Sequence, residues 1–137
     1  MLSLYYKEGT ITTNTTTIMG KRLHSAVKYE VKYDGKADFN YEQDRINALI
    51  DALAEGDCSY EDEIYFSDTV SANRANLLAN VDKIIHPDEN WEWQETVDYN
   101  IEKLEKDGYT RESIYKSLKA IIEQSDSNCE DVHFAWF

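Results

Sequence analysis

The spacing of the apolar residues changes along this chain, and that change limits the folds it can adopt. Apolar and polar residues alternate over 2–6 and strictly over 27–33, and residues 10–19 between them are rich in β-branched side chains. A period of two with β-branched and aromatic residues is typical of half-buried strands. We therefore predict an N-terminal antiparallel β-meander of about three strands, over residues 2–6, 10–19 and 27–33.

Residues 39–124 follow a period near 3.6 instead, which is typical of amphipathic helices. Four helices are expected, and their candidate N-terminal caps are Asn40, Ser71, Asp88 and Thr110. Their candidate stop signals are Gly56, Pro87 and Gly108. Between the first two helices, we expect an acidic loop over 57–63 and either a short strand or a helical turn over 64–66.

Residues 129–137 are expected to form a terminal strand. Val132, Phe134 and Trp136 alternate there with a second set of fairly apolar residues. A strand that is apolar on both faces can join the interior of a sheet instead of lying at its edge. The expected fold class is therefore α+β, in a single domain over 1–137 that comprises the meander (1–38), a mainly helical part (39–124) and the terminal strand (129–137).

Charge is also unevenly distributed along the chain. The formal net charge is -13, yet the first 40 residues carry more bases than acids. Residues 51–102 contain only two bases, Arg74 and Lys83, among fourteen acids. Excess charge destabilises a compact chain by self-repulsion. It can serve solubility, or it can imitate the phosphate backbone of a nucleic acid, and the sequence leaves both explanations open.

Two acidic segments that contain aromatic residues are the candidate partner-binding surfaces. The first comprises Asp57, Tyr60, Glu61, Asp62, Glu63 and Asp68. The second comprises Glu89, Trp91, Glu92 and Glu95. Aromatic residues among charges are typical of interface anchors, and carboxylates three or four residues apart on a helix are separated by about 5–6 Å, which is of the order of the phosphate spacing in DNA. The alternatives are a solvated loop for the first segment and core packing of Trp91 for the second.

Other functional classes have no support in the sequence. It contains no catalytic motif, phosphate-binding loop or metal-ligand spacing, so we expect no enzyme activity, cofactor or metal. Cys58 and Cys129 are expected to be reduced thiols, although one disulfide stays open. Without a leader sequence or a long apolar run, we expect a cytoplasmic protein with no membrane partner. The acid balance argues against direct nucleic-acid binding, and a homo-oligomer stays open.

The run over residues 60–68, Tyr-Glu-Asp-Glu-Ile-Tyr-Phe-Ser-Asp, resembles in type an acidic segment of some anti-CRISPR proteins. Those are small phage-encoded inhibitors that mimic DNA and occupy the PAM-reading site of a CRISPR effector nuclease. The resemblance implies that Glu61, Asp62, Glu63 and Asp68 face the Arg and Lys residues that normally read DNA. It implies an inhibitor of a basic nucleic-acid-binding protein in a bacterial host cell. An immunity protein against a basic toxin nuclease and an acidic structural or regulatory module are the alternatives.

Overall fold

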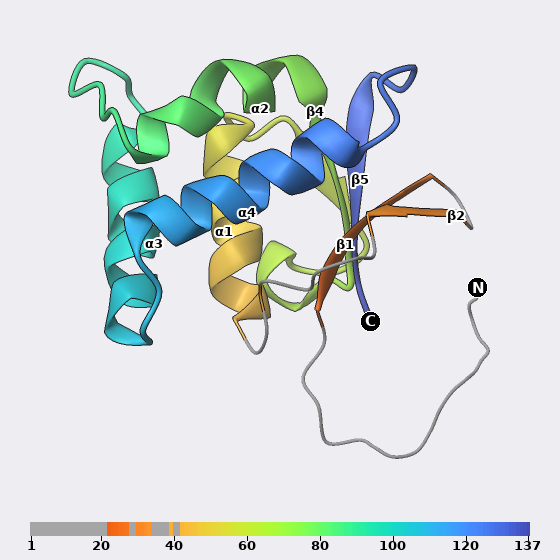
Figure 1. The fold of residues 1–137 in the computed structure, drawn as a ribbon, viewed down its shortest axis with the longest axis horizontal. Helices are drawn as coiled ribbons and strands as arrows, with labels where there is room; N and C mark the ends of the chain where they lie inside the picture. Colours follow the sequence, from red (N-terminus) through yellow and green to blue (C-terminus); the bar gives the residue numbers. More distant parts are fainter. Residues whose placement is uncertain (1–21, 28–29, 34–38, 40–41) are drawn as a thin grey trace.

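The computed structural model describes residues 22–27, 30–33, 39 and 42–137, and it has the α+β fold that the sequence predicts (Figure 1). Its strands are β1 (Leu23–Val27), β2 (Glu30–Tyr33), β3 (Cys58–Tyr60), β4 (Thr69–Asn73) and β5 (Asp131–Trp136). Its helices are α1 (Gln43–Leu53), α2 (Arg74–Asn80), α3 (Gln94–Lys106) and α4 (Arg111–Gln124). Two short 3-10 turns are η2 (Ile64–Phe66) and η3 (Val81–Ile84).

The strands form one antiparallel sheet in the order β2-β1-β5-β4-β3. Strand β5 pairs with β1 on one side and with β4 on the other, so it is an interior strand of the sheet. Its residues Val132, Phe134 and Trp136 are buried. The expectation that this strand joins the interior of the sheet is therefore confirmed.

The single strand predicted over residues 27–33 is wrong in its extent. Val27 ends β1 and Glu30 begins β2, and these two residues pair with each other across an antiparallel hairpin. The alternation of apolar and polar residues runs without a break from Val27, the end of β1, to Tyr33, the end of β2, so the sequence period does not show where the chain reverses. The strands expected over 2–6 and 10–19, and the cap expected at Asn40, lie outside the described residues.

The acidic loop predicted over 57–63 is wrong over residues 58–60, and the helix start predicted at Ser71 is wrong. Residues 58–60 form the edge strand β3, and Ser71 lies in the middle of β4. The helix begins at Arg74, and its cap lies two residues after Ser71, at Asn73, whose side chain accepts a hydrogen bond from the backbone N–H of Asn76. Serine is strongly preferred at helix caps, and it has no strand preference, so the sequence alone favoured the wrong assignment.

The third helix begins later than predicted, whereas the fourth begins where expected. Regular α3 starts at Gln94. The carboxylate of Asp88 accepts a hydrogen bond from the backbone N–H of Asn90, which closes an isolated turn before the helix. The chain leaves α3 at Gly108, whose φ is 101°. Thr110 and Ser113 then exchange side-chain to backbone hydrogen bonds in a capping box that begins α4.

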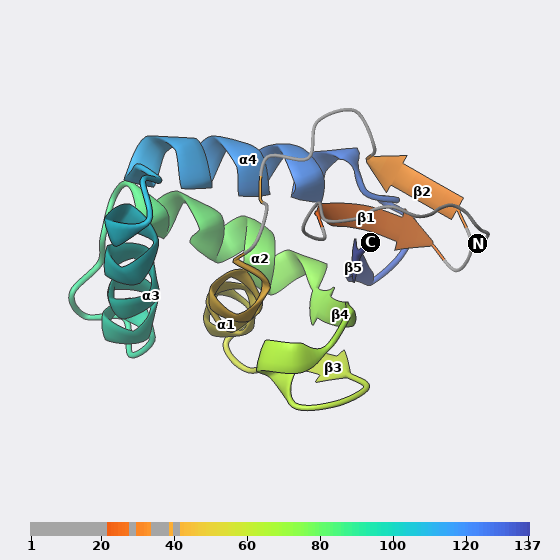
Figure 2. The same ribbon diagram turned by 90° about the horizontal axis from the view of Figure 1, so that it is seen from below.

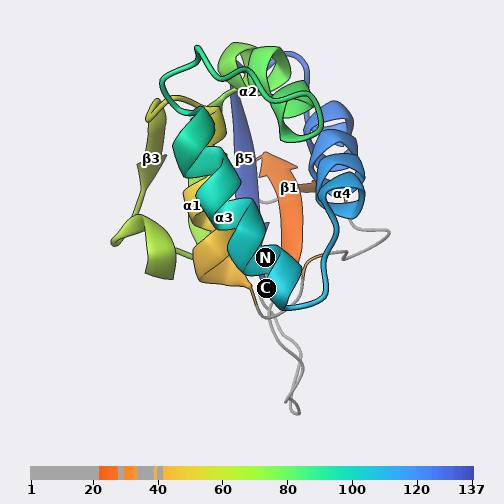
Figure 3. The ribbon, with the colours of Figure 1, turned by 90° about the vertical axis from the view of Figure 1, so that its left-hand side faces the viewer.

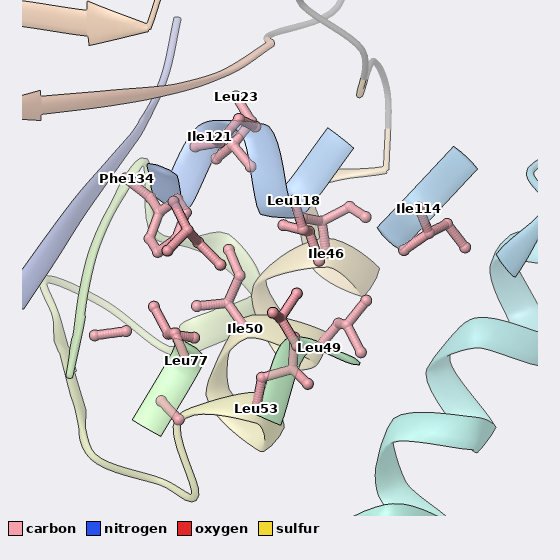
Figure 4. Close-up of a cluster of buried hydrophobic side chains, with 14 of the residues drawn as sticks. Leu23, Ile46, Leu49, Ile50, Leu53, Leu77, Ile114, Leu118, Ile121 and Phe134 are labelled. Atoms are coloured by element: carbon pink, nitrogen blue, oxygen red, sulfur yellow. The ribbon is translucent and has the colours of Figure 1, made fainter. Parts of the chain in front are cut away.

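Helices α1, α2 and α4 contact the sheet, and α3 packs against α1 farther from it (Figure 2). All four helices contribute buried side chains to the core. Residues from all three inner helices meet β5 in one apolar cluster, in which Ile50, Leu77, Leu118 and Phe134 are buried (Figure 4). Among the described residues, no helix combines the length and apolar composition needed to cross a bilayer.

Candidate functional site

Residues 61–68 connect β3 to β4, and we call residues 60–68, which include Tyr60 at the end of β3, the aromatic–acidic loop. Its aromatic side chains are exposed: Tyr60 by 44%, Tyr65 by 47% and Phe66 by 71%. The three acids that follow Tyr60 are exposed as well, and these are Glu61, Asp62 and Glu63. Large apolar side chains gathered on a surface and rimmed by polar residues mark interaction sites. The loop therefore has the composition of a docking surface.

Ser67 fixes the backbone of this loop from inside. Its side chain is fully buried, and its Oγ accepts a hydrogen bond from the backbone N–H of Asp62 at 2.9 Å and donates to the carbonyl of Glu63 at 3.2 Å. Its own carbonyl accepts from Nε2 of Gln43 and from Nδ2 of Asn47, at 2.8 and 3.0 Å. Both amides come from α1, so the loop is fastened to that helix.

Asn47 is the second fixed point, and it is also fully buried. Besides Ser67, its Nδ2 donates to the carbonyl of Ile64 at 2.7 Å, and its Oδ1 accepts from the indole Nε1 of Trp136 at 2.8 Å. Every hydrogen-bonding group of this amide has a partner, which is the condition under which a buried polar network stabilises a single conformation. The aromatic side chains are thus presented from a backbone that is already ordered.

Asp68 has a different position from the other predicted loop residues. It is half-buried, and its Oδ1 accepts a hydrogen bond from Nε2 of Gln43 at 3.0 Å. Its carbonyl accepts from the backbone N–H of Trp136 at 2.8 Å. Asp68 therefore helps to hold the base of the loop, whereas the exposed acids lie beyond it.

The exposed acids of the loop have no neutralising partner in the described part of the chain. The ion pairs found there all use a base of α4, namely Arg111 with Asp98, Lys116 with Glu112 and Lys119 with Asp82. None of them involves Glu61, Asp62 or Glu63. Three adjacent carboxylates without a cation repel one another, and a basic partner would remove that repulsion.

Trp91, in the second predicted segment, is half-buried and held by contacts within the protein. Its Nε1 donates to Oε2 of Glu55 at 3.1 Å, and Nζ of Lys83 lies 4.3 Å from the centroid of its ring. Both partners come from parts of the chain that the sequence did not connect with Trp91. The cation over its ring face makes Trp91 a poorer candidate anchor than Phe66.

The acids around Trp91 line a shallow hollow of about 420 Å³ at the start of α3. Its lining residues include Glu89, Glu92, Glu95 and Asp98. Glu55, which binds the Trp91 indole, stands two residues before Asp57, and Asp57 leads directly into β3. Glu55, which follows α1, therefore connects the two predicted segments, and β3 lies between Asp57 and residues 61–68.

Reactive groups near the loop are held in an inert form. Sγ of Cys58 donates to Oδ1 of Asp51 at 3.1 Å, and burial together with this hydrogen bond raises the pKa of the thiol well above its ordinary value. A thiol that stays protonated is a poor nucleophile. Cys58 and Cys129 are both free, and no cluster of potential metal ligands occurs within the described ranges.

Comparison with protein-family models, with curated proteins and with solved structures finds no match for the chain.

Proposed function

We propose that this protein is an inhibitor that docks its aromatic–acidic loop into the basic nucleic-acid-binding cleft of a partner protein and blocks that cleft. One observation carries the proposal above all others. A single hydrogen-bonded loop presents Phe66, which is 71% exposed, beside three exposed carboxylates that have no cation partner among the described residues.

The chemistry of the loop matches such a cleft in two respects. Carboxylates can take the places of phosphates opposite Arg and Lys, and complementary potentials accelerate encounter with a basic surface. Aromatic side chains are the residues that most often supply the binding energy of an interface. The buried network of Ser67 and Asn47 supports tight binding, because a loop that is already ordered loses little conformational entropy when it docks.

A bacterial defence nuclease, such as a CRISPR effector, is the partner class that we propose. These enzymes hold nucleic acid in channels lined with positive charge and read short DNA motifs with Arg side chains. Occupation of such a channel would exclude DNA without any chemical step, which agrees with a site made of carboxylates and aromatic rings.

Competition with DNA tests the proposal. Purified RNA-guided nucleases would be titrated with the full-length protein, at low and high ionic strength, while the release of their target DNA is measured. The loop variant E61K/D62K/E63K would be compared with E102K/E105K/E123K, which makes the same change of net charge at exposed acids of α3 and α4. We expect the loop variant to lose about 100-fold in affinity, because like charges then face each other, and the control variant to stay close to the parent.

Three results would contradict the proposal. Equal losses in the two variants would show that only total charge matters. An affinity that does not respond to ionic strength would exclude docking driven by carboxylates. Failure to displace DNA from any nuclease of this class would remove the proposed target.

A further inference from the structure

Strand β3 lies at the outer edge of the sheet, opposite β2 in the strand order (Figure 3). Its inner edge pairs with β4 through Cys58 and Ala72, Ser59 and Ser71, and Tyr60 and Val70. Nothing in the described part of the chain pairs with its outer edge. An unpaired edge is a template for another strand unless the protein blocks it.

The hydrogen-bond pattern shows which groups of β3 face outward. The backbone N–H of Trp136 donates to the carbonyl of Asp68, and that of Asn73 donates to the carbonyl of Asp57. The pair of Asp57 and Asn73 is therefore hydrogen-bonded. Because bonded and non-bonded pairs alternate in an antiparallel ladder, the next pair, Cys58 and Ala72, is non-bonded, and the pair after it, Ser59 and Ser71, is bonded. The backbone groups of Cys58 and Tyr60 therefore point away from the sheet.

Three of these outward groups have no partner among the described residues. The N–H of Cys58 is used locally, since it donates to the carbonyl of Gly56 at 3.0 Å. The N–H and carbonyl of Tyr60 and the carbonyl of Cys58 make no hydrogen bond in the described ranges. Tyr60 can thus exchange two backbone hydrogen bonds with one residue of an added strand, and Cys58 can accept a third.

The charges beside β3 determine what kind of strand can pair there. Asp57 directly precedes the strand, and Glu61, Asp62 and Glu63 directly follow it. The strand itself contains no Lys or Pro of the kind that usually protects an edge. A second copy of this protein would bring its own acids against these, and like charges across a strand pair are destabilising. A strand that carries Lys or Arg has the complementary charge.

We propose that an extended basic segment of the partner protein adds to β3 as a further antiparallel strand. The inference rests on the proposed function, which it deepens by stating how the partner is held. Side chains alternate between the two faces of a strand, so an apolar residue opposite Tyr60 lies beside the exposed ring. The residues on either side of it in the added strand point to the opposite face of the sheet. Lys or Arg is favoured at those positions, because the acids that flank β3 attract positive charge. Main-chain bonds supply affinity in such a complex, and side chains supply specificity.

A peptide of alternating Lys and Val is the probe. The full-length protein would be titrated with millimolar peptide, and amide hydrogen exchange would be followed residue by residue. A matched peptide with every backbone amide N-methylated keeps the charges but has no donors. We expect slower exchange at the Tyr60 amide in the complex, and about tenfold weaker binding of the methylated peptide, since each lost hydrogen bond weakens binding severalfold.

Protein variants provide a second comparison. Tyr60→Pro removes the outward N–H, whereas Tyr60→Thr removes the ring but keeps the donor, so we expect the proline variant to bind the parent peptide more weakly than the threonine variant. Equal binding of the two peptides, no binding of either, or unchanged exchange at Tyr60 would overturn strand addition. Self-association through β3, detected by sedimentation, would overturn the identity of the added strand.

The proposed function is judged separately from strand addition. It requires only that DNA competition depends on Glu61, Asp62 and Glu63. If both peptides bind equally and E61K/D62K/E63K abolishes their binding, then strand addition fails while docking by charge stands.

Discussion

The indole nitrogen of Trp136 donates a 2.8 Å hydrogen bond to Oδ1 of Asn47, although the two residues are 89 positions apart in the sequence. The same asparagine holds the carbonyls of Ile64 and Ser67. One buried amide therefore joins the last strand, the first helix and the aromatic–acidic loop. The shape of the candidate site depends on a residue from the end of the chain.

Replacement of Asn47 by leucine should destabilise the protein strongly. The substitution leaves the Trp136 N–H and the carbonyls of Ile64 and Ser67 without this partner in a buried place, and an unsatisfied buried group costs about 1–3 kcal/mol. We expect Asn47→Leu to lower the free energy of unfolding by about 3 kcal/mol, measured by urea denaturation. Asn128→Leu, at an exposed position, is the control. A loss below about 1 kcal/mol would show that the network contributes little.

Truncation of Phe66 should separate binding from stability. Because its side chain is 71% exposed, Phe66→Ala should leave the free energy of unfolding within about 0.5 kcal/mol of the parent. If the ring anchors the complex, loss of affinity for the partner should reach about 2 kcal/mol, or about 30-fold. Leu78→Ala removes an exposed apolar side chain from α2 and is the matched control. Similar affinities for both variants and the parent would remove Phe66 from the interface.

The raised pKa of Cys58 predicts a loss of stability in mild alkali. In the unfolded chain the thiol loses its proton near its ordinary pKa of about 8.5, whereas in the folded protein burial and the hydrogen bond to Asp51 keep it protonated. The unfolded state therefore binds fewer protons above that pH, and stability should fall there by at most about 1.4 kcal/mol per pH unit, since solvent reaches part of the thiol, and be unaffected below it. Urea denaturation between about pH 7 and pH 10, a range that spans the ordinary thiol pKa, measures the effect. Cys58→Val should abolish the part of the decline that the thiol causes. A parallel decline in both proteins would contradict the assignment.

Arg74 should be essential for the end of α4. Its guanidinium donates to the carbonyls of Ile122, Cys129 and Asp126 and to the hydroxyl of Ser125. Lysine cannot reproduce this fork of donors, so Arg74→Lys should lower the free energy of unfolding by about 2 kcal/mol. Lys116→Met breaks only the exposed pair with Glu112 and should cost less than about 0.5 kcal/mol. The midpoints of thermal unfolding of the two variants test this difference. Similar midpoints would show that Arg74 is dispensable.

Local signals predicted part of this fold well. The capping box at Thr110 and the period of α4 depend on neighbours in the sequence, and so does the two-faced apolar pattern of β5. The hairpin of β3 and β4 escaped prediction because its central pair is Ser59 and Ser71, which have no strand preference. Short polar strands acquire their structure from the pairing partner, which the sequence does not name.

The sequence predicted which residue types the candidate site contains, but not the contacts that hold the site in place. Acids among aromatics marked residues 57–63 and 89–95, and the structure shows that Tyr60 and Glu61 are exposed. Their part in partner binding stays a prediction. The roles of Asn47 and Glu55 could not be foreseen, because each acts on a segment that only the tertiary fold brings near. A polar residue inside an apolar helical stripe, as Asn47 is in α1, is the one signal that could have indicated a buried network.

Charge reversal in the second acidic segment tests whether it contributes to the same interface. Glu89, Glu92 and Glu95 are exposed, and they flank Trp91, whose indole donates to Glu55. Because exposed charges are screened beyond about 8 Å at physiological ionic strength, E89K/E92K/E95K should weaken partner binding by only about fivefold there, and by more at low salt. Sites without shared partners act independently, so its effect should multiply with that of E61K/D62K/E63K. A combined variant no weaker than E61K/D62K/E63K alone would place the second segment outside the interface, and a loss far above the product would show that both segments contact the same group of the partner.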